Sequence, residues 1–176
     1  MLDAVFLNGT VGAGKTTTAF ALSDLLGAGE VPHAVVDLDQ VRLLRPPPAG
    51  DPFQHEVELA NLAALAANYR AAGARRLVVA GVLESADEVP RYRTALGGRS
   101  MLVCRLTVDP ATARARLERR HDDDPARCAW HLSRTVELTA TLDRVRLDDV
   151  EVATERRSPD EVAREVARHA GWTDVA

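Results

Sequence analysis

A short glycine-rich stretch near the start of the chain constrains the fold more than any other feature. The pattern Gly9-x-x-x-x-Gly14-Lys15-Thr16 comes directly after the apolar run at residues 4–7. Glycines let backbone N–H groups approach a polyanion at the start of a helix, where a lysine and a hydroxyl can add their own contacts. The stretch therefore predicts a strand, a phosphate-binding loop and a helix, in that order.

Each residue type in this loop has an expected role. Lys15 would reach the terminal phosphates of a nucleotide as a catalytic cation, and the hydroxyl of Thr16 would ligate Mg²⁺. Lys15 is also the only lysine among the 22 Lys and Arg residues of the chain. An accidental Gly/Ala/Thr-rich turn is the alternative, and the flanking strand and helix patterns argue against it. The expected nucleotide-binding residues are Gly9, Gly12, Ala13, Gly14, Lys15, Thr16 and Thr17.

Composition restricts the classes of partner. The chain has 176 residues and a formal net charge of −4, so no overall basic field favours nucleic acid or an anionic membrane. Two cysteines and five scattered histidines show no metal-ligand spacing. No signal peptide or membrane-spanning run is evident. We expect a single domain over residues 1–176, located in the cytoplasm, and the sequence leaves open whether it forms a homodimer.

Apolar runs and helical periodicity alternate along the chain. Short apolar runs predict strands, and apolar residues spaced by three or four predict helices. Asp109 followed by Pro110 is typical of a helix start, and residues 158–161 form a capping pattern. The expected strands are residues 4–7, 33–39, 77–82, 101–108 and 150–153, and the expected helices are residues 15–26, 53–72, 88–96, 110–120, 129–146 and 159–169.

This alternation predicts an α/β fold with three layers. Near-continuous apolar strands are typical of a parallel sheet that helices cover on both faces. We expect a five-stranded parallel sheet between two helical layers. No internal repeat and no second domain are evident in the sequence.

Two acids mark the end of the second expected strand. Asp37 and Asp39 alternate along it, so we expect them on the same side, near the phosphate-binding loop. One carboxylate could orient or deprotonate an attacking hydroxyl, and either could help to hold Mg²⁺. Alternatively, the two acids are only a strand terminus and a helix cap.

The loop and the segment Asp37-Leu38-Asp39-Gln40-Val41-Arg42 together resemble the small-molecule kinases of the P-loop superfamily. The closest pattern is Asp-Gly-Asp-x-x-Arg of adenylylsulfate kinases, with gluconate kinase, shikimate kinase and chloramphenicol phosphotransferase as relatives. The resemblance implies that Asp37 is the acid facing the acceptor and that Arg42 binds the substrate, and we expect Asp39 to bind the substrate as well. The stretch after the third expected strand, residues 81–85 followed by 91–93, resembles that of gluconate-kinase-like proteins, which implies that Arg91 meets the acceptor. Leu38 stands where adenylylsulfate kinases carry glycine, and their downstream lysines are absent, which argues against that particular activity.

Arginines crowd the expected helix 110–120. Kinases of this superfamily close a helical lid from this region, and the resemblance implies a lid at about residues 114–131. Arg116 and Arg120 are the catalytic candidates, because positive charge there would stabilise the transferring phosphoryl group. The alternative is a solvated helix face paired with Glu118 and the acids at 122–124. The resemblance also implies an adenine site near residues 154–157.

The most specific functional prediction is therefore an ATP- and Mg²⁺-dependent phosphotransferase. It would transfer the γ-phosphate to a hydroxyl of a small metabolite, nucleotide or antibiotic. A GTPase base-reading motif Asn-Lys-x-Asp is excluded, because Lys15 is the only lysine. The alternatives are a nucleotide-binding regulatory ATPase and a kinase of nucleic-acid ends, and the acidic net charge argues against the latter.

Overall fold

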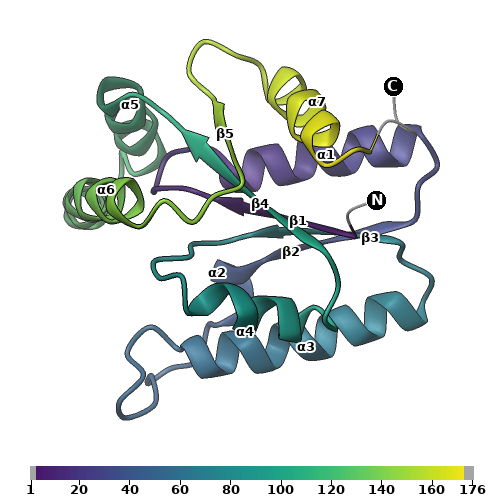
Figure 1. The fold of residues 1–176 in the computed structure, drawn as a ribbon. Helices are drawn as coiled ribbons and strands as arrows, with labels where there is room; N and C mark the ends of the chain where they lie inside the picture. The colour runs from purple at the N-terminus through teal and green to yellow at the C-terminus, as the bar shows by residue number, and fades with distance from the viewer. Residues whose placement is uncertain (1–2, 173–176) are drawn as a thin grey trace.

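The computed structural model describes residues 3–172, and strands and helices alternate along them (Figure 1). The strands are β1 (Ala4–Asn8), β2 (His33–Asp37), β3 (Arg76–Ala80), β4 (Met101–Thr107) and β5 (Val150–Ala153). The helices are α1 (Lys15–Ala28), α2 (Leu38–Val41), α3 (His55–Ala71), α4 (Glu88–Ala95), α5 (Pro110–Arg120), α6 (Pro125–Val145) and α7 (Pro159–His169). Within this part of the chain, no helix has both the length and the apolar character needed to cross a bilayer.

The strands form one parallel sheet in the order β2-β3-β1-β4-β5. Figure 1 shows α1 and α7 on one face of this sheet and α3 and α4 on the other. The predicted α/β fold, with a five-stranded parallel sheet between two helical layers, is confirmed.

Two apolar cores lie on the two faces of the sheet. The central strand β1 is fully buried, and its side chains alternate between them. Val5 and Leu7 belong to the core under α1 and α7. Ala4 and Phe6 belong to the core under α3 and α4. A central strand buried on both faces explains why its sequence is continuously apolar.

The predicted strand at residues 33–39 is too long. The strand ends at Asp37, and Leu38 begins the short helix α2. A carboxylate oxygen of Asp37 accepts a hydrogen bond from the backbone N–H of Asp39, so Asp37 is the helix cap. The prediction that both acids alternate on one strand was therefore wrong, because local capping ends the strand before Asp39.

The predicted helix at residues 129–146 begins four residues earlier than expected. Pro125 opens α6, and the side chain of Asp124 accepts a hydrogen bond from the backbone N–H of Arg127. The acids at 122–124 read as a polar break in the sequence, but Asp124 followed by Pro125 is a helix start of the same kind as Asp109 followed by Pro110.

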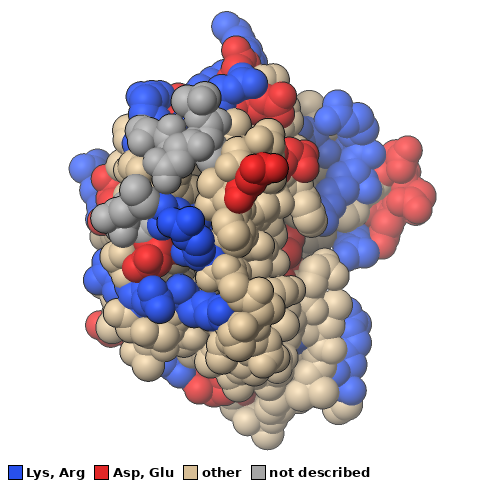
Figure 2. Space-filling model, turned by 90° about the vertical axis from the view of Figure 1, so that its right-hand side faces the viewer, with Lys and Arg blue, Asp and Glu red and all other residues tan. Residues whose placement is uncertain are grey.

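The carboxyl ends of the strands meet at one end of the molecule. In Figure 1 this end lies on the left, where α5 and α6, the short helix α2 and the N-termini of α3 and α4 also gather. Figure 2 shows the opposite end, where basic and acidic side chains are interspersed and form no continuous basic stripe on the visible face. A cavity of about 410 Å³ lies among the arginines at 70, 75, 76 and 99 near the amino ends of the strands.

Candidate active site

The loop between β1 and α1 has the backbone that a phosphate-binding loop needs. Gly9, Gly12 and Gly14 have φ values of 141°, 83° and 93°. A Cβ on Gly9 would lie 2.6 Å from the carbonyl oxygen of Leu106, so no other residue fits there without a backbone shift. Gly14 is the N-cap of α1 and supplies no side-chain cap, which leaves the first N–H groups of the helix without a side-chain partner.

Lys15 lies folded over its own loop. Its Nζ donates hydrogen bonds to the carbonyl oxygens of Gly9, at 2.8 Å, and Thr10, at 3.0 Å. Burial lowers the pKa of Lys15 to about 8, although the nearby carboxylates of Asp39 and Asp37 act in the opposite direction. A desolvated ammonium held by neutral carbonyls is well suited to receive an anionic phosphate.

Thr16 joins the loop to the end of β2. Its hydroxyl donates a 2.7 Å hydrogen bond to one carboxylate oxygen of Asp37, while the other oxygen caps α2. A hydroxyl and a carboxylate are oxygen ligands of the type that Mg²⁺ prefers, and Mg²⁺ commonly completes its shell with water and substrate phosphates. Among residues 3–172, no group of three or more His, Cys, Asp or Glu side chains could hold a metal. The donor set of Thr16 and Asp37, a hydroxyl and a carboxylate, fits a magnesium ion whose remaining ligands come from water and a nucleotide.

A chain of polar contacts leads from Asp39 into the core between α3 and α4. Arg42 pairs with Asp39 and also lies 3.2 Å from Glu58, whose side chain is only 3% exposed. The hydroxyl of the fully buried Tyr92 donates to the other carboxylate oxygen of Glu58. Burial raises the pKa of Glu58, and the hydrogen bond from Tyr92 and the charge of Arg42 oppose that rise.

Further acidic side chains lie around this chain of contacts. Glu88 lies 3.4 Å from His55 and accepts hydrogen bonds from the backbone N–H groups of Glu84 and Ser85, just after β3. Arg91 donates to both carboxylate oxygens of Glu56, at 2.7 and 2.8 Å. We call the following residues the acidic cluster: Asp39, Glu56, Glu58, Glu84 and Glu88.

The two candidate arginines of α5 lie in different environments. Arg116 donates to the carbonyl oxygen of Gly12 and to both the hydroxyl and the carbonyl oxygen of Thr154, at 3.0–3.1 Å. It therefore clamps the glycine-rich loop to the segment after β5. Arg120 is exposed and makes no hydrogen bond or ion pair with the described residues, but its charge contributes to lowering the pKa of Lys15.

Helix α6 covers the other side of the loop. The Thr10 hydroxyl donates to the carbonyl oxygen of Thr135 at 3.0 Å, and the Thr135 hydroxyl lies 3.2 Å from the carbonyl oxygen of Val11. The preceding residue, Arg134, pairs with Glu84 and lies 5.6 Å from the ring centre of Phe53. Helix α6 thus touches both the loop and the acidic cluster.

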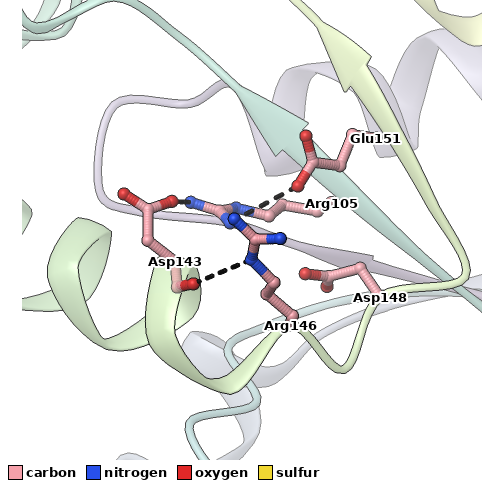
Figure 3. Close-up of a pocket in the computed structure, with 5 residues that line it drawn as sticks. All are labelled: Arg105, Asp143, Arg146, Asp148 and Glu151. Carbon is pink, nitrogen blue, oxygen red and sulfur yellow. Dashed lines mark hydrogen bonds and ion pairs between the residues drawn. The ribbon is translucent and has the colours of Figure 1, made fainter.

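A polar cavity of about 410 Å³ opens beside the base of the loop (Figure 3). Arg105 lies across it and pairs with Asp143 and Glu151 at 2.5 and 3.5 Å. Asp148, on the same cavity, accepts a 2.9 Å hydrogen bond from the side-chain amide of Asn8. This bond orients the side-chain amide oxygen of Asn8, which accepts a 2.9 Å hydrogen bond from the backbone N–H of Gly9.

The structure thus places the predicted residues in three groups. Lys15, Thr16, Asp37, Arg116 and the loop glycines are together, and Asp39 and Arg42 lie next to them on α2. Arg91 belongs to the outer edge of the acidic cluster and touches none of the loop residues. Sequence reasoning missed the participants that come from distant elements, which are Asn8, Glu58, Tyr92, Arg134, Thr135 and Asp148. Thr154 belongs to the segment 154–157 that the resemblance implies for the adenine, and its contact with Arg116 was not predicted. Only the buried acid Glu58, at an apolar helix position, left a signal in the sequence.

Solved structures with the same architecture cover nearly the whole chain. They include a tunicamycin resistance protein from Deinococcus radiodurans, with 23% identity, coverage of 97% of this chain and 96% of that one, and a TM-score of 0.67. A gluconokinase from Sinorhizobium meliloti 1021 has 17% identity, coverage of 97% and 92%, and a TM-score of 0.64. Shikimate kinase from Acinetobacter baumannii, in complex with shikimate, has 16% identity, coverage of 100% and 96%, and a TM-score of 0.61. At these identities the likeness shows a shared P-loop kinase fold.

Comparison with families of sequences gives a closer assignment. No protein with a curated description matches the sequence significantly. The family model described as an AAA domain matches residues 5–138, which include the glycine-rich loop, the acids at 37 and 39 and the arginines of α5. The match covers more than half of the chain, and the chain therefore belongs to this AAA domain family.

Proposed function

We propose that the protein is an ATP- and Mg²⁺-dependent phosphotransferase that acts on a hydroxyl of a small molecule. The observation that carries the proposal is the 2.7 Å hydrogen bond between Thr16 and Asp37, with Asp39 two residues further on. It joins the loop suited to a triphosphate to an acid-lined region that could receive an acceptor. Phosphoryl transfer depends mainly on positioning and charge stabilisation, and these parts supply both.

The donor side is built from the glycine-rich loop. The free N–H groups at the start of α1 and the ammonium of Lys15 would hold the β- and γ-phosphates. Thr16 and Asp37 would hold Mg²⁺, which neutralises charge on the phosphate oxygens when bound. The remaining nucleotide-binding residues are proposed as the loop positions 9, 12, 13, 14 and 17.

The geometry favours roles for the two acids that differ from those expected from the sequence, where Asp37 faces the acceptor and Asp39 binds the substrate. Both carboxylate oxygens of Asp37 are already engaged, one by Thr16 and one by the backbone of α2. Asp39 has a side chain that is 65% exposed, and within the described part of the chain it pairs only with Arg42. We therefore assign Asp37 to the metal side, and Asp39 to orienting the acceptor hydroxyl and taking its proton.

The arginines of α5 would stabilise charge on the transferring group. Arg120 has no partner among the described residues and lies close enough to Lys15 to affect its pKa, so its guanidinium is free to contact a γ-phosphate. Arg116 would fix the loop against the segment after β5, which we propose as the adenine side. A lid at about residues 114–131 would comprise the end of α5, the turn at 121–124 and the first turns of α6.

Three variants test these roles. Lys15→Ala should abolish ATP binding, measured by titration calorimetry. Asp39→Asn should keep the ATP affinity within about threefold of the wild-type value and stop acceptor-dependent ADP release. Asp37→Asn should make ATP binding less dependent on Mg²⁺. If Asp39→Asn transfers phosphate at the wild-type rate, Asp39 is not the acceptor acid. If no acceptor raises ADP release while ATP changes oligomerisation or partner binding, the regulatory alternative replaces the kinase.

A further inference from the structure

Three arginines around the acidic cluster are already paired with carboxylates. Arg42 directly follows α2, Arg91 lies on α4 and Arg134 lies on α6. Arg42 is shared between Asp39 and the buried Glu58, and Arg91 holds both oxygens of Glu56. Arg134 is shared between Glu84 and Glu137, which lies at 3.3 Å.

Carboxylates also outnumber guanidinium groups in this region. Glu88 has no arginine partner among residues 3–172 and is held by His55 and by backbone N–H groups. An acceptor that carried a carboxylate, sulfate or phosphate would therefore enter a region of like charge, which is the usual way in which a site rejects a wrong partner.

Recruiting Arg42 to an anionic acceptor would be especially unfavourable. Glu58 is 3% exposed, and its contacts to Arg42 and Tyr92 are what compensate for its burial. If Arg42 turned to a new anion, the buried carboxylate would lose its charge partner, and breaking a buried pair in this way is strongly destabilising. Arg42 is thus built as a structural arginine that orients Asp39.

Large apolar side chains are exposed beside these pairs. Leu43 and Leu44 directly follow Arg42 and are 64% and 45% exposed, and Phe53, at the end of the same loop, is 54% exposed. The guanidinium of Arg134 lies over the ring of Phe53, and Trp130, one turn earlier on α6, is 57% exposed. Such a group of exposed apolar side chains around a polar region is typical of a binding site.

We propose that the acceptor is an uncharged hydroxyl compound with an apolar portion. The inference rests on the proposed phosphotransferase function and specifies its substrate class. The hydroxyl group of the acceptor contacts Asp39, and its apolar portion packs on Leu43, Leu44 and Phe53. The paired arginines are not available to bind an anionic group. Arg45 is the exception in this loop, because it is exposed and has no acidic partner among residues 3–172.

The first test compares acceptors that differ in one group. Each scaffold of a panel of sugars, cyclitols and nucleosides is offered with ATP in an anionic form, a neutral form and a neutral form bearing an alkyl or aryl group. ADP release gives kcat/KM, and we expect the neutral apolar form to exceed the anionic form at least tenfold. Preference for the anionic form overturns the inference and leaves the kinase standing. If no member raises ADP release, the phosphotransferase proposal fails, and the inference fails with it.

The second test releases a paired arginine. Glu56→Gln frees Arg91 and should raise the ratio of kcat/KM for the anionic over the neutral form at least threefold. Glu118→Gln is the matched control, because it frees Arg114 from a 3.4 Å pair on the exposed face of α5 and should leave the ratio unchanged. An unchanged ratio in Glu56→Gln contradicts the proposed neutralisation. Arg45→Gln should also leave the ratio unchanged, and a tenfold loss confined to anionic acceptors would make Arg45 their binding residue.

Discussion

The substitution Gly81→Ala links core packing directly to the position of Asp39, the proposed acceptor acid. Gly81 follows β3, and a Cβ placed on it would lie 2.4 Å from Cδ1 of Leu38 and 3.0 Å from Cζ of Phe6. Leu38 is 1% exposed and stands between Asp37 and Asp39, as the first residue of α2. The side chain of Leu38 therefore occupies the space that any residue larger than glycine would need at position 81.

The expected cost follows from this overlap. Leu38 is enclosed in the core, so it cannot turn aside without moving α2, and overpacking of this kind costs about 1–3 kcal/mol of unfolding free energy. For a chain of this length, each kcal/mol lowers Tm by about 2–4 °C. Because α2 carries Asp39, we also expect acceptor-dependent turnover to fall at least tenfold, with ATP affinity changed by less than about threefold.

A double-mutant cycle tests the cause. Leu38→Ala alone should cost about 2–5 kcal/mol, because it leaves a cavity. In the double variant with Gly81→Ala, the new methyl group enters that cavity, so the combined cost should be at least about 1 kcal/mol less than the sum of the single costs. Urea denaturation followed by tryptophan fluorescence supplies the free energies. Additivity within about 0.5 kcal/mol would refute the proposed overlap.

A matched control separates this overlap from the general effect of replacing glycine. Gly27, on the last turn of α1, has an ordinary helical backbone, and an added Cβ would meet only His33, at 4.0 Å. Gly27→Ala should be neutral or should stabilise the protein by about 0.5–1 kcal/mol, since alanine has the higher helix propensity. A loss of stability equal to that of Gly81→Ala would remove the steric explanation.

Three further predictions concern the glycine-rich loop. The pKa of Lys15 is about 8, and bound phosphates must raise it, so ATP binding takes up a proton above that pH. The ATP affinity measured by calorimetry should therefore be constant below about pH 8 and fall by up to about tenfold per pH unit above it. Arg116→Lys loses the forked hydrogen bonds and should weaken ATP binding by about ten- to a hundredfold, equivalent to about 1.5–3 kcal/mol, whereas the exposed Arg119→Lys should not. Asp148→Ala should destabilise the protein by about 1–2 kcal/mol and weaken ATP binding, because it frees the amide of Asn8, while Asp148→Asn, which can still accept that hydrogen bond, should retain both properties in thermal melts and titrations.

The features that depend on residues close together in the chain were predictable from the sequence. The glycine-rich loop, the strand before it and the helix after it were predicted correctly, because spacing alone dictates them. Asp109 and Ser158 were correctly predicted as helix caps. Asp39 was misplaced on a strand for a local reason as well, since a helix cap at Asp37 competes with strand alternation and both fit the same residues.

Long-range pairings could not be predicted in this way. The ring of Tyr92 is 34 positions from Glu58 along the chain, and Asn8 is 140 positions from Asp148. Each of these contacts depends on how two elements pack, which a hydrophobic pattern does not specify. The pairing of Arg91 with Glu56 on the neighbouring helix could not be predicted for the same reason.

The two halves of the site are supported in different ways. Residues outside the motif fix the glycine-rich loop on three sides: Asn8 at its base, Thr135 of α6 on one flank and Arg116 of α5 at Gly12. Because phosphoryl transfer depends on positioning, such support preorganises the donor side.

On the proposed acceptor side, the buried Glu58 holds Arg42 and through it Asp39. Beyond Arg42 the chain runs into the exposed loop 43–54, where few side chains are buried. The glycine-rich loop is held by contacts on three sides, whereas the loop 43–54 is exposed. We therefore expect substitutions in the loop 43–54 to change which acceptor is preferred without disturbing nucleotide binding. Replacing Leu43, Leu44 or Phe53 by serine should therefore alter the preference among neutral acceptors and leave ATP affinity within about threefold, and a parallel loss of both would show that the two halves are not independent.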